Sequence, residues 1–347
     1  RAVEYLPDDE ALKERRSRGR GLTRPELAVL LSYSKISLFD SLLQSEVPDD
    51  GFFGRDLLDY FPDALVKAYR EPLMKHRLRR EIIATILANA VVNRMGFAFV
   101  HRFADDHGVD RAEVVKAYAI AHEIYDGDRY WLPIQELDGR LPAALQLRLF
   151  GRAIGLMKHV TTWLLNNHWT GRTVHEAVAQ FGDGIDALTA MLPDSLPGNY
   201  RGDWDKAVAG MCADGVPVGL AHQLANTMVL GSAPDIIEIA AEAQRPLTDA
   251  AQIYFLVGDR LNMLWLLSTI IAFPVHSKWQ ALARSNLRED SYRLHRRIAA
   301  RILQIPGATA QERLDAWLAG NPAKLKFGIQ RLQDLQAGGA PDFMTLA

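Results

Sequence analysis

The sequence predicts an all-α fold, an irregular multi-helix bundle with no significant sheet. Apolar residues recur with the helical period along nearly the whole chain, and no segment shows sustained strand alternation. Helix-start signals are also clear. A Ser, Thr or Asp stands three residues before an acidic residue, so the first side chain can accept from the third helical N–H and the acid can reach back. These pairs are Thr23–Glu26, Asp110–Glu113, Thr173–Glu176, Ser232–Asp235 and Thr309–Glu312.

The helices follow one another with short, polar breaks between them. In chain order, we predict helices at residues 8–16, 25–45, 54–60, 63–76, 79–106, 111–125, 142–168, 174–191, 203–213, 217–230, 234–244, 248–272, 276–304, 310–319 and 322–336. Prolines near predicted helix starts support these boundaries, because the missing N–H costs nothing there. They are Pro25, Pro62, Pro72, Pro142, Pro234 and Pro322.

A break rich in Gly, Asp and Pro suggests a division into two sub-bundles. Residues 126–142 are the expected hinge, which gives an N-terminal sub-bundle at 1–138 and a C-terminal one at 139–347. One continuous helical domain is the alternative. No fixed repeat period runs through the chain, so we do not expect a solenoid.

Charge and cysteine content restrict the class of partner. Lys and Arg total 40 and Asp and Glu total 42, giving a formal net charge of −2 in 347 residues. Such a chain has no basic excess to neutralise a phosphate backbone, so we expect no nucleic-acid partner. The single Cys212 excludes an internal disulfide framework and favours a reducing, cytoplasmic compartment. With no histidine beside it, Cys212 is predicted to be a small core residue rather than a nucleophile.

The termini and the most apolar run bear on membrane and secretory interpretations. The chain begins Arg-Ala-Val-Glu, without an initiator Met or a basic-then-apolar leader, so we expect a fragment of a longer protein. Leu261–Val275 is the most apolar run. It falls short of the roughly 20 residues that cross a bilayer, so a core helix and no membrane partner are expected.

Motifs for catalysis, cofactors and metals are missing from the sequence. The Gly-rich strand-to-helix turn of a dinucleotide site and the Gly-Lys-Ser/Thr of a phosphate loop do not occur. No two of the ten histidines stand four apart, and His122-Glu123 and His175-Glu176 continue to Asp126 and Ala179 instead of a second histidine. We therefore predict no catalytic, cofactor-binding or metal-ligating residue in this chain.

Two charged segments have a possible ligand-binding interpretation. Asp105, Asp106 and Asp110 resemble the Mg²⁺-binding carboxylates of an all-α lyase, but Asp110 is better used as the N-cap of the next helix. The basic run 75–81 could bind a nucleotide or an acidic surface, although such runs are more often a solvated helix face.

Two amides on one apolar stripe are the most specific local feature. Asn89 and Asn93 lie one turn apart on the stripe that contains Ile82, Ile86 and Val100, with Arg94 beside them. Buried amides need partners, so we expect them to bond to a neighbouring loop or helix end within the bundle. Docking of another domain or of a polar ligand is the alternative. Most tryptophans lie in similar stripes and are predicted to be core anchors or interface plugs.

Several segments resemble one known family. They are Leu22–Ile36, Tyr60-Phe-Pro62, His76–Thr85 and Asn89–Gly96, which cover the first third of the chain densely. In these segments the sequence resembles the C-terminal helical region of the large bacterial NAD-specific glutamate dehydrogenases. The resemblance implies a very long polypeptide in which regulatory-type domains come first, the dehydrogenase core next and this helical region last. It also implies that the parent oxidatively deaminates L-glutamate to 2-oxoglutarate and ammonium with NAD.

The resemblance gives this chain an accessory role, structural or also regulatory, with no catalytic residue. It implies that the partners are the catalytic core of the same polypeptide and further copies of the parent in a homo-oligomer. Two other interpretations stay open: a free-standing all-α interaction module, and the lyase described above. The residues expected at an interdomain interface are Arg24, Glu26, Lys35, Asn89, Asn93 and Arg94.

Overall fold

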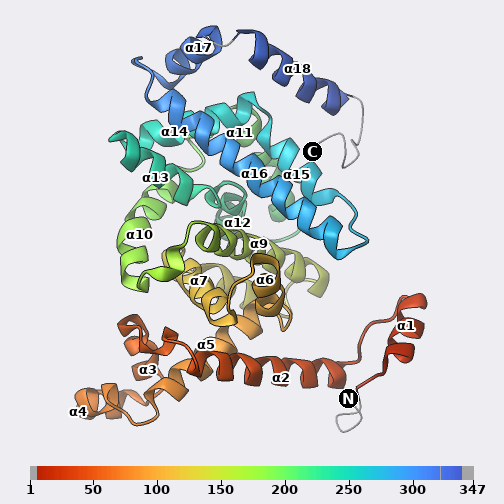
Figure 1. Ribbon diagram of the computed structural model, residues 1–347, viewed down its shortest axis with the longest axis vertical. Helices are drawn as coiled ribbons and strands as arrows, with labels where there is room; N and C mark the ends of the chain where they lie inside the picture. The colour runs from red at the N-terminus through yellow and green to blue at the C-terminus, as the bar shows by residue number, and fades with distance from the viewer. Residues whose placement is uncertain (1–5, 321, 338–347) are drawn as a thin grey trace. The chain divides into compact units, whose positions relative to one another are not determined.

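The computed structural model describes residues 6–320 and 322–337, and all regular structure in those ranges is helical (Figure 1). They form eighteen α-helices and three short 3₁₀ helices, with no strand. The predicted all-α class is therefore confirmed.

The chain forms two compact units, each made of two chain segments. Unit 1 comprises Arg1–Glu123 and Met157–Val178, and unit 2 comprises Ile124–Leu156 and Ala179–Ala347. These units are groupings by contact within the folded chain. The boundary expected between residues 138 and 139 stays a prediction.

The first helices belong to unit 1. They are α1 (Asp9–Ser17), α2 (Arg24–Leu43), α3 (Gly54–Asp59), α4 (Asp63–Met74), α5 (Arg79–Met95), α6 (Phe99–His107) and α7 (Arg111–Ile124), with the 3₁₀ helices η1 (Val47–Asp49), η2 (Gly51–Phe53) and η3 (Trp169–Gly171). The last residue of α7, Ile124, already belongs to unit 2, and the bounds of α9 (Ala143–Asn166) and α10 (Val174–Met191) include residues of both units.

The remaining helices belong to unit 2. They are α8 (Asp128–Gln135), α11 (Gly198–Ala213), α12 (Val218–Leu230), α13 (Ala233–Ala243), α14 (Leu247–Arg260), α15 (Met263–Ala272), α16 (Lys278–Leu303), α17 (Ala310–Gly320) and α18 (Pro322–Ala337).

Two helices predicted as continuous are broken. The predicted helix 79–106 bends by 92° between α5 and α6, and the predicted helix 248–272 bends by 64° between α14 and α15. Gly96 and Asn262 occupy the breaks with φ of 88° and 51°. These are residue types that tolerate positive φ, so the chain can turn there without a large steric cost.

The predicted hinge contains a helix that was not predicted. Helix α8 lies at Asp128–Gln135 and buries Tyr130, Trp131 and Ile134. Its short length and the Gly127-Asp128 pair at its start resemble a turn, which hid the apolar spacing of these three residues.

In unit 1, helices α2 and α5 pack antiparallel and set the register of the surrounding elements. Ser34 Oγ donates to the Phe97 carbonyl just after α5, at 2.9 Å. At the opposite end, Arg80 Nη2 donates to the carbonyls of Leu43 and Ser45, at 2.8 and 2.9 Å. The fully buried residues between these ties are Leu38, Leu42, Ile83, Ala84 and Val91.

A single carboxylate joins distant parts of unit 1. One oxygen of Asp50 accepts from the Phe52 N–H at 3.0 Å, and the other accepts from the Val174 N–H at 3.1 Å. The ring of Phe52 also meets His175 edge-on, with centroids 5.1 Å apart. The second chain segment of unit 1 is therefore tied to the first by both polar and aromatic contacts.

In unit 2, helix α14 lies among α11, α13, α15, α16 and α17. The His295 ring of α16 stacks on Tyr254 of α14 with centroids 3.8 Å apart, and its Nε2–H donates to the Tyr254 carbonyl at 2.8 Å. Other buried polar groups are bonded in the same way: Trp204 Nε1 donates to Asn226 Oδ1 at 2.8 Å, and Tyr125 Oη donates to the Leu230 carbonyl at 2.6 Å. Such pairing removes the penalty of burying these groups.

Some predicted burial is wrong. Cys212 was expected to be a core residue because of its small size. It is exposed instead, on the outer side of α11. Trp131, Trp163, Trp169 and Trp204 are core residues as predicted, whereas Trp279 is 79% exposed.

Among the described helices, none taken singly has the length and apolar character needed to cross a membrane. The bent pairs α5–α6 and α14–α15 meet that length and composition only when their members are combined.

We predict that His295 makes stability depend on pH. Burial lowers the pKa of His295 to about 4 from its ordinary value of 6.5. The unfolded chain therefore binds a proton that the folded chain does not between these values, so stability is fully present above pH 6.5 and falls as the pH drops toward 4. The loss amounts to about 3 kcal/mol.

The measurement is urea unfolding of wild type and His295→Gln at a series of pH values between 4 and 7. The amide of Gln can still donate to Tyr254 but does not titrate, so the variant should lose less stability on acidification. Parallel pH profiles for the two proteins would contradict this origin.

We also predict that Gly258 is required for the close approach of α14 to its neighbours. A Cβ there would overlap Tyr200 Oη and lie 2.9 Å from His295 Cε1. Gly258→Ala should therefore destabilise the protein by roughly 1–3 kcal/mol. The control is Gly210→Ala in α11, where nothing lies within 4 Å of an added Cβ. It should stabilise by up to about 1 kcal/mol, and similar urea midpoints for the two variants would count against tight packing at Gly258.

Candidate functional site

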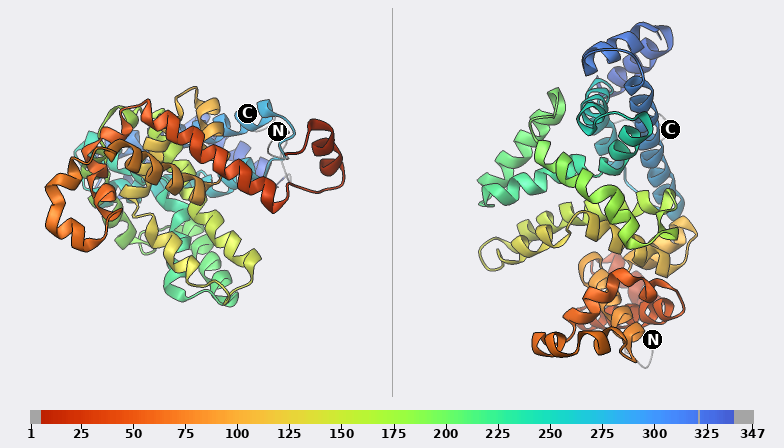
Figure 2. Two further views of the ribbon diagram at one scale, coloured as in Figure 1. Left: turned by 90° about the horizontal axis from the view of Figure 1, so that it is seen from below. Right: turned by 90° about the vertical axis from the view of Figure 1, so that its left-hand side faces the viewer.

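The N-terminal half of α2 is an apolar helix that is only partly covered. Residues 24–33 include Leu27, Val29, Leu30 and Leu31, yet none of the ten is buried. Tyr33 and Ile36 are 49% and 55% exposed. The reason is the register with α5: the tie from Ser34 to Phe97 marks where α5 ends, and α2 continues beyond it toward α1 (Figures 1 and 2).

A local network fixes the start of this half-helix. Thr23 N–H donates to Glu26 Oε2 at 2.7 Å and Glu26 N–H approaches Thr23 Oγ1 at 3.5 Å, so the predicted capping box is confirmed. Arg15 of α1 donates to the same Glu26 oxygen at 2.7 Å. The bond from Arg15, followed by those from Thr23, lowers the pKa of Glu26 to about 2.

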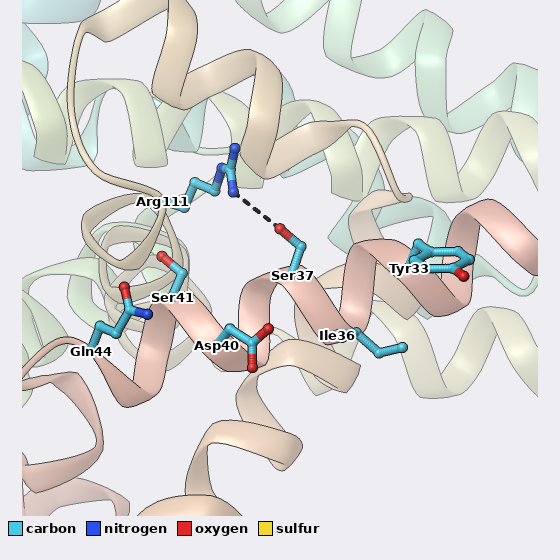
Figure 3. A pocket seen from close by; sticks show the side chains of 7 residues that line it. All are labelled: Tyr33, Ile36, Ser37, Asp40, Ser41, Gln44 and Arg111. Carbon is cyan, nitrogen blue, oxygen red and sulfur yellow. Dashed lines mark hydrogen bonds between the residues drawn. The ribbon is translucent and has the colours of Figure 1, made fainter. Parts of the chain in front are cut away.

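An open pocket of about 370 Å³ continues along the exposed face of α2 (Figure 3). We call this pocket the α2 groove. Its lining residues on α2 lie at helical spacings of three and four, so they form one stripe of about 16 Å. They are Tyr33, Ile36, Ser37, Asp40, Ser41 and Gln44, and the first residue of α7, Arg111, completes the wall.

The two charges of the α2 groove do not neutralise each other. Arg111 Nη1 donates to the neutral Ser37 Oγ at 3.0 Å, as Figure 3 shows. Within the described part of the chain, neither Arg111 nor Asp40 has an ion-pair partner within 4 Å. Arg111 also contributes, after burial, to lowering the pKa of His101. The groove therefore presents apolar surface, hydroxyls and one uncompensated charge of each sign.

The residues predicted at an interface have mixed surroundings. Arg24 is exposed and Lys35 is half-buried on α2, whereas Glu26 is held within the chain by Arg15 and Thr23. On α5, Asn89 and Arg94 are half-buried and Asn93 is exposed. Their interface role stays a prediction.

The expectation that Asn93 is a buried amide is wrong. The core face of α5 contains Ile83, Leu87 and Val91, one residue beyond the stripe chosen from the sequence. Ile82 and Ile86 of that stripe are half-buried, which places the two amides on the outer side of the helix.

Part of the basic run 75–81 serves the fold. Besides capping the last carbonyls of α2, Arg80 pairs with Asp49, and Arg79 Nη1 lies 3.8 Å from the same carboxylate. A basic residue at a helix C-terminus is a recognised stabilising pattern, but the two partners are far apart in sequence. Because of that separation, the sequence alone favoured a solvated helix face for this basic run.

The aspartates considered for Mg²⁺ are placed as helix-end residues. Asp105 and Asp106 are exposed at the end of α6. Asp110 directly precedes α7, and its backbone carbonyl accepts from Glu113 and Val114, whereas the side-chain cap expected at Asp110 stays a prediction. Across residues 6–320 and 322–337, no group of three or more His, Cys, Asp or Glu side chains is arranged to hold a metal ion.

Comparison with known proteins identifies the family. A family model described as glutamate dehydrogenase, C-terminal, matches residues 19–347, nearly the whole chain. The chain belongs to this family. The resemblance seen in the first third of the sequence is thereby confirmed over residues 19–347.

Three curated relatives of this family member are NAD-specific glutamate dehydrogenases. The protein from Pseudomonas aeruginosa is 36% identical over 349 residues, that from Halomonas elongata 33% over 348, and that from Mycobacterium tuberculosis 31% over 349. These matches cover 99–100% of this chain but only 21–22% of the relatives. The chain thus spans about a fifth of their length.

We predict that Glu26 holds the start of α2 in place. In Glu26→Ala, the contacts to Arg15 and Thr23 are lost together, so the first amides of α2 should exchange hydrogen faster. Because its pKa is lowered to about 2 from 4.5, the carboxylate contributes stability above pH 4.5 and loses it as the pH falls toward 2.

The measurement is hydrogen–deuterium exchange of the peptide that contains residues 24–31, in wild type and variant. Glu46→Ala is the control, since Glu46 is exposed and makes no side-chain capping bond. Equal exchange rates in Glu26→Ala and wild type would contradict the prediction that Glu26 holds the start of α2 in place.

Proposed function

We propose that this chain is the C-terminal helical accessory part of a large NAD-specific glutamate dehydrogenase. In this proposal, the whole polypeptide oxidatively deaminates L-glutamate to 2-oxoglutarate and ammonium. NAD binding and hydride transfer take place in the part of the polypeptide outside this chain. The observation that carries the proposal is the match of the whole chain to about a fifth of each relative.

The physical character of the fold supports this division of labour. A nicotinamide site is typically built where a Gly-rich turn joins a strand to a helix, because the backbone must approach the pyrophosphate closely. The regular structure of residues 6–320 and 322–337 is helical throughout, and their capping and buried polar contacts serve to hold helices together.

The role proposed for the chain is to brace the rest of the polypeptide, with regulation as a further use. Large exposed apolar side chains, including Tyr33 and Ile36, offer surface for such contacts. The proposed partners are the catalytic core of the same polypeptide and further copies of the parent in a homo-oligomer. We place the protein in the cytoplasm, which suits an NAD-linked enzyme of amino-acid breakdown.

The proposal predicts that NAD binding and turnover require the rest of the polypeptide and do not occur in this chain alone. Calorimetric titration of NAD into the isolated, helical chain should give no saturable heat. The whole polypeptide should bind NAD and reduce it with L-glutamate, which is followed by absorbance. Saturable micromolar binding by the isolated chain would contradict the assigned accessory role. A whole polypeptide that is inactive with glutamate and NAD would contradict the assigned reaction.

A further inference from the structure

We propose that the α2 groove is the docking surface for an amphipathic segment of the parent polypeptide that lies before this chain. The inference rests on the proposed function, because it requires that this chain be one part of a longer polypeptide. The segment would place apolar side chains against Tyr33 and Ile36, an acidic residue opposite Arg111 and a basic residue opposite Asp40.

The apolar part of the argument is the continuity of one helix face. Tyr33 and Ile36 are about half exposed, and Val29 and Leu30 precede Tyr33 by four and three residues on the same face. Single exposed apolar residues are ordinary on protein surfaces. Here two exposed residues and two half-buried ones lie on one face that continues into a groove of about 16 Å, and this matches the anchor spacing by which a helix or groove recognises an amphipathic segment.

The charge part of the argument identifies the chemistry of the partner. Asp40 and Arg111 line the same groove, yet Arg111 bonds only to the neutral Ser37 and Asp40 has no ionic partner among the described residues. A partner that covered both charges without compensating them would pay a large desolvation cost. A segment with one acidic and one basic residue would pair both, and their order along the segment would fix its direction and register.

The position of the groove favours a partner from the same polypeptide. In the relatives, the matched region is only 21–22% of the protein, so most of the polypeptide lies outside it. Helix α2 lies near the start of this region. A segment that precedes the region in the same polypeptide is therefore connected to α2 through the chain itself, and their contact is intramolecular. Such a connection raises the effective concentration of the partner to the millimolar range, which a separate copy has to match by affinity alone.

The first test is hydroxyl-radical footprinting of the full-length parent protein. Tyr33 and Ile36 should be protected well beyond what their exposures of 49% and 55% allow. Tyr69 and Ile271 are matched references, since each is 57% exposed. If Tyr33 and Ile36 react at the rates of free half-exposed side chains, the proposal is overturned.

The second test separates the proposed partner from a second copy by charge reversal in the full-length protein. Asp40→Lys and Arg111→Glu should each lower the protection of Tyr33 about tenfold, as an attractive charged contact becomes repulsive. In the double variant, Tyr33 should be protected no better than in either single variant, because the partner's charges are unchanged. Asp183→Lys, an exposed site on α10, is the control and should leave the protection intact.

A symmetric contact between two copies would behave differently. There, Asp40 of one copy would face Arg111 of the other, so reversing both charges would restore the pairing and the protection. Restoration in the double variant would therefore overturn the proposal. A photocrosslinking side chain at position 36 gives an independent readout: a link within one polypeptide supports the proposal, and a link between two polypeptides overturns it.

Turnover of wild-type protein in the same preparations keeps the two hypotheses apart. If glutamate and NAD are converted while Tyr33 and Ile36 stay unprotected, only the docking surface is wrong. If they are not converted, the proposed function fails whatever the footprint shows.

Discussion

The length mismatch between α2 and its packing partner governs the exposed surface of this protein. The antiparallel register is fixed at one end by Ser34 and at the other by Arg80, so α5 covers only the second half of α2. The first ten residues, about 15 Å of helix, have an apolar sequence of which no residue is fully buried. Capping by Thr23 and Glu26 and the tie to Arg15 are what such a half-helix needs, because an isolated segment of this length is not stable by propensity alone.

Unit 2 shows the opposite arrangement, in which several buried polar groups are paired and helices approach closely. Tyr125, Trp204 and His295 each donate to an acceptor inside the unit, and Gly258 lets α14 meet Tyr200. Burial, the main cause, raises the pKa of Tyr130 and Tyr292 to about 12, so both phenols stay neutral at physiological pH. Groups used in this way are committed to holding the helices together. The uncompensated charges of the α2 groove are not.

The sequence predicted most of the fold because its signals are local. The capping boxes at Thr23–Glu26 and Thr173–Glu176 formed as expected, since both partners lie within one turn. Ser232–Asp235 did not form one: no side-chain cap bond is present, and Asp235 pairs with Arg296 of α16 instead. Breaks at Gly96 and Asn262 were missed because the apolar spacing continues across each bend. The α2 groove could not be located, because the exposed part of an apolar helix depends on the length and register of its neighbour.

The contact of Asp50 with Val174 has a consequence for how this protein is made. The two residues are 124 positions apart, and the N–H that Asp50 accepts belongs to the second chain segment of unit 1. A ribosome adding roughly 5–20 residues per second needs on the order of ten seconds to supply that segment after Asp50 has been synthesised. During this interval the surface that will receive α10 is bare, including the ring of Phe52 that later meets His175. The nascent chain therefore has to be shielded, or to tolerate an incomplete unit, until residues 157–178 leave the exit tunnel.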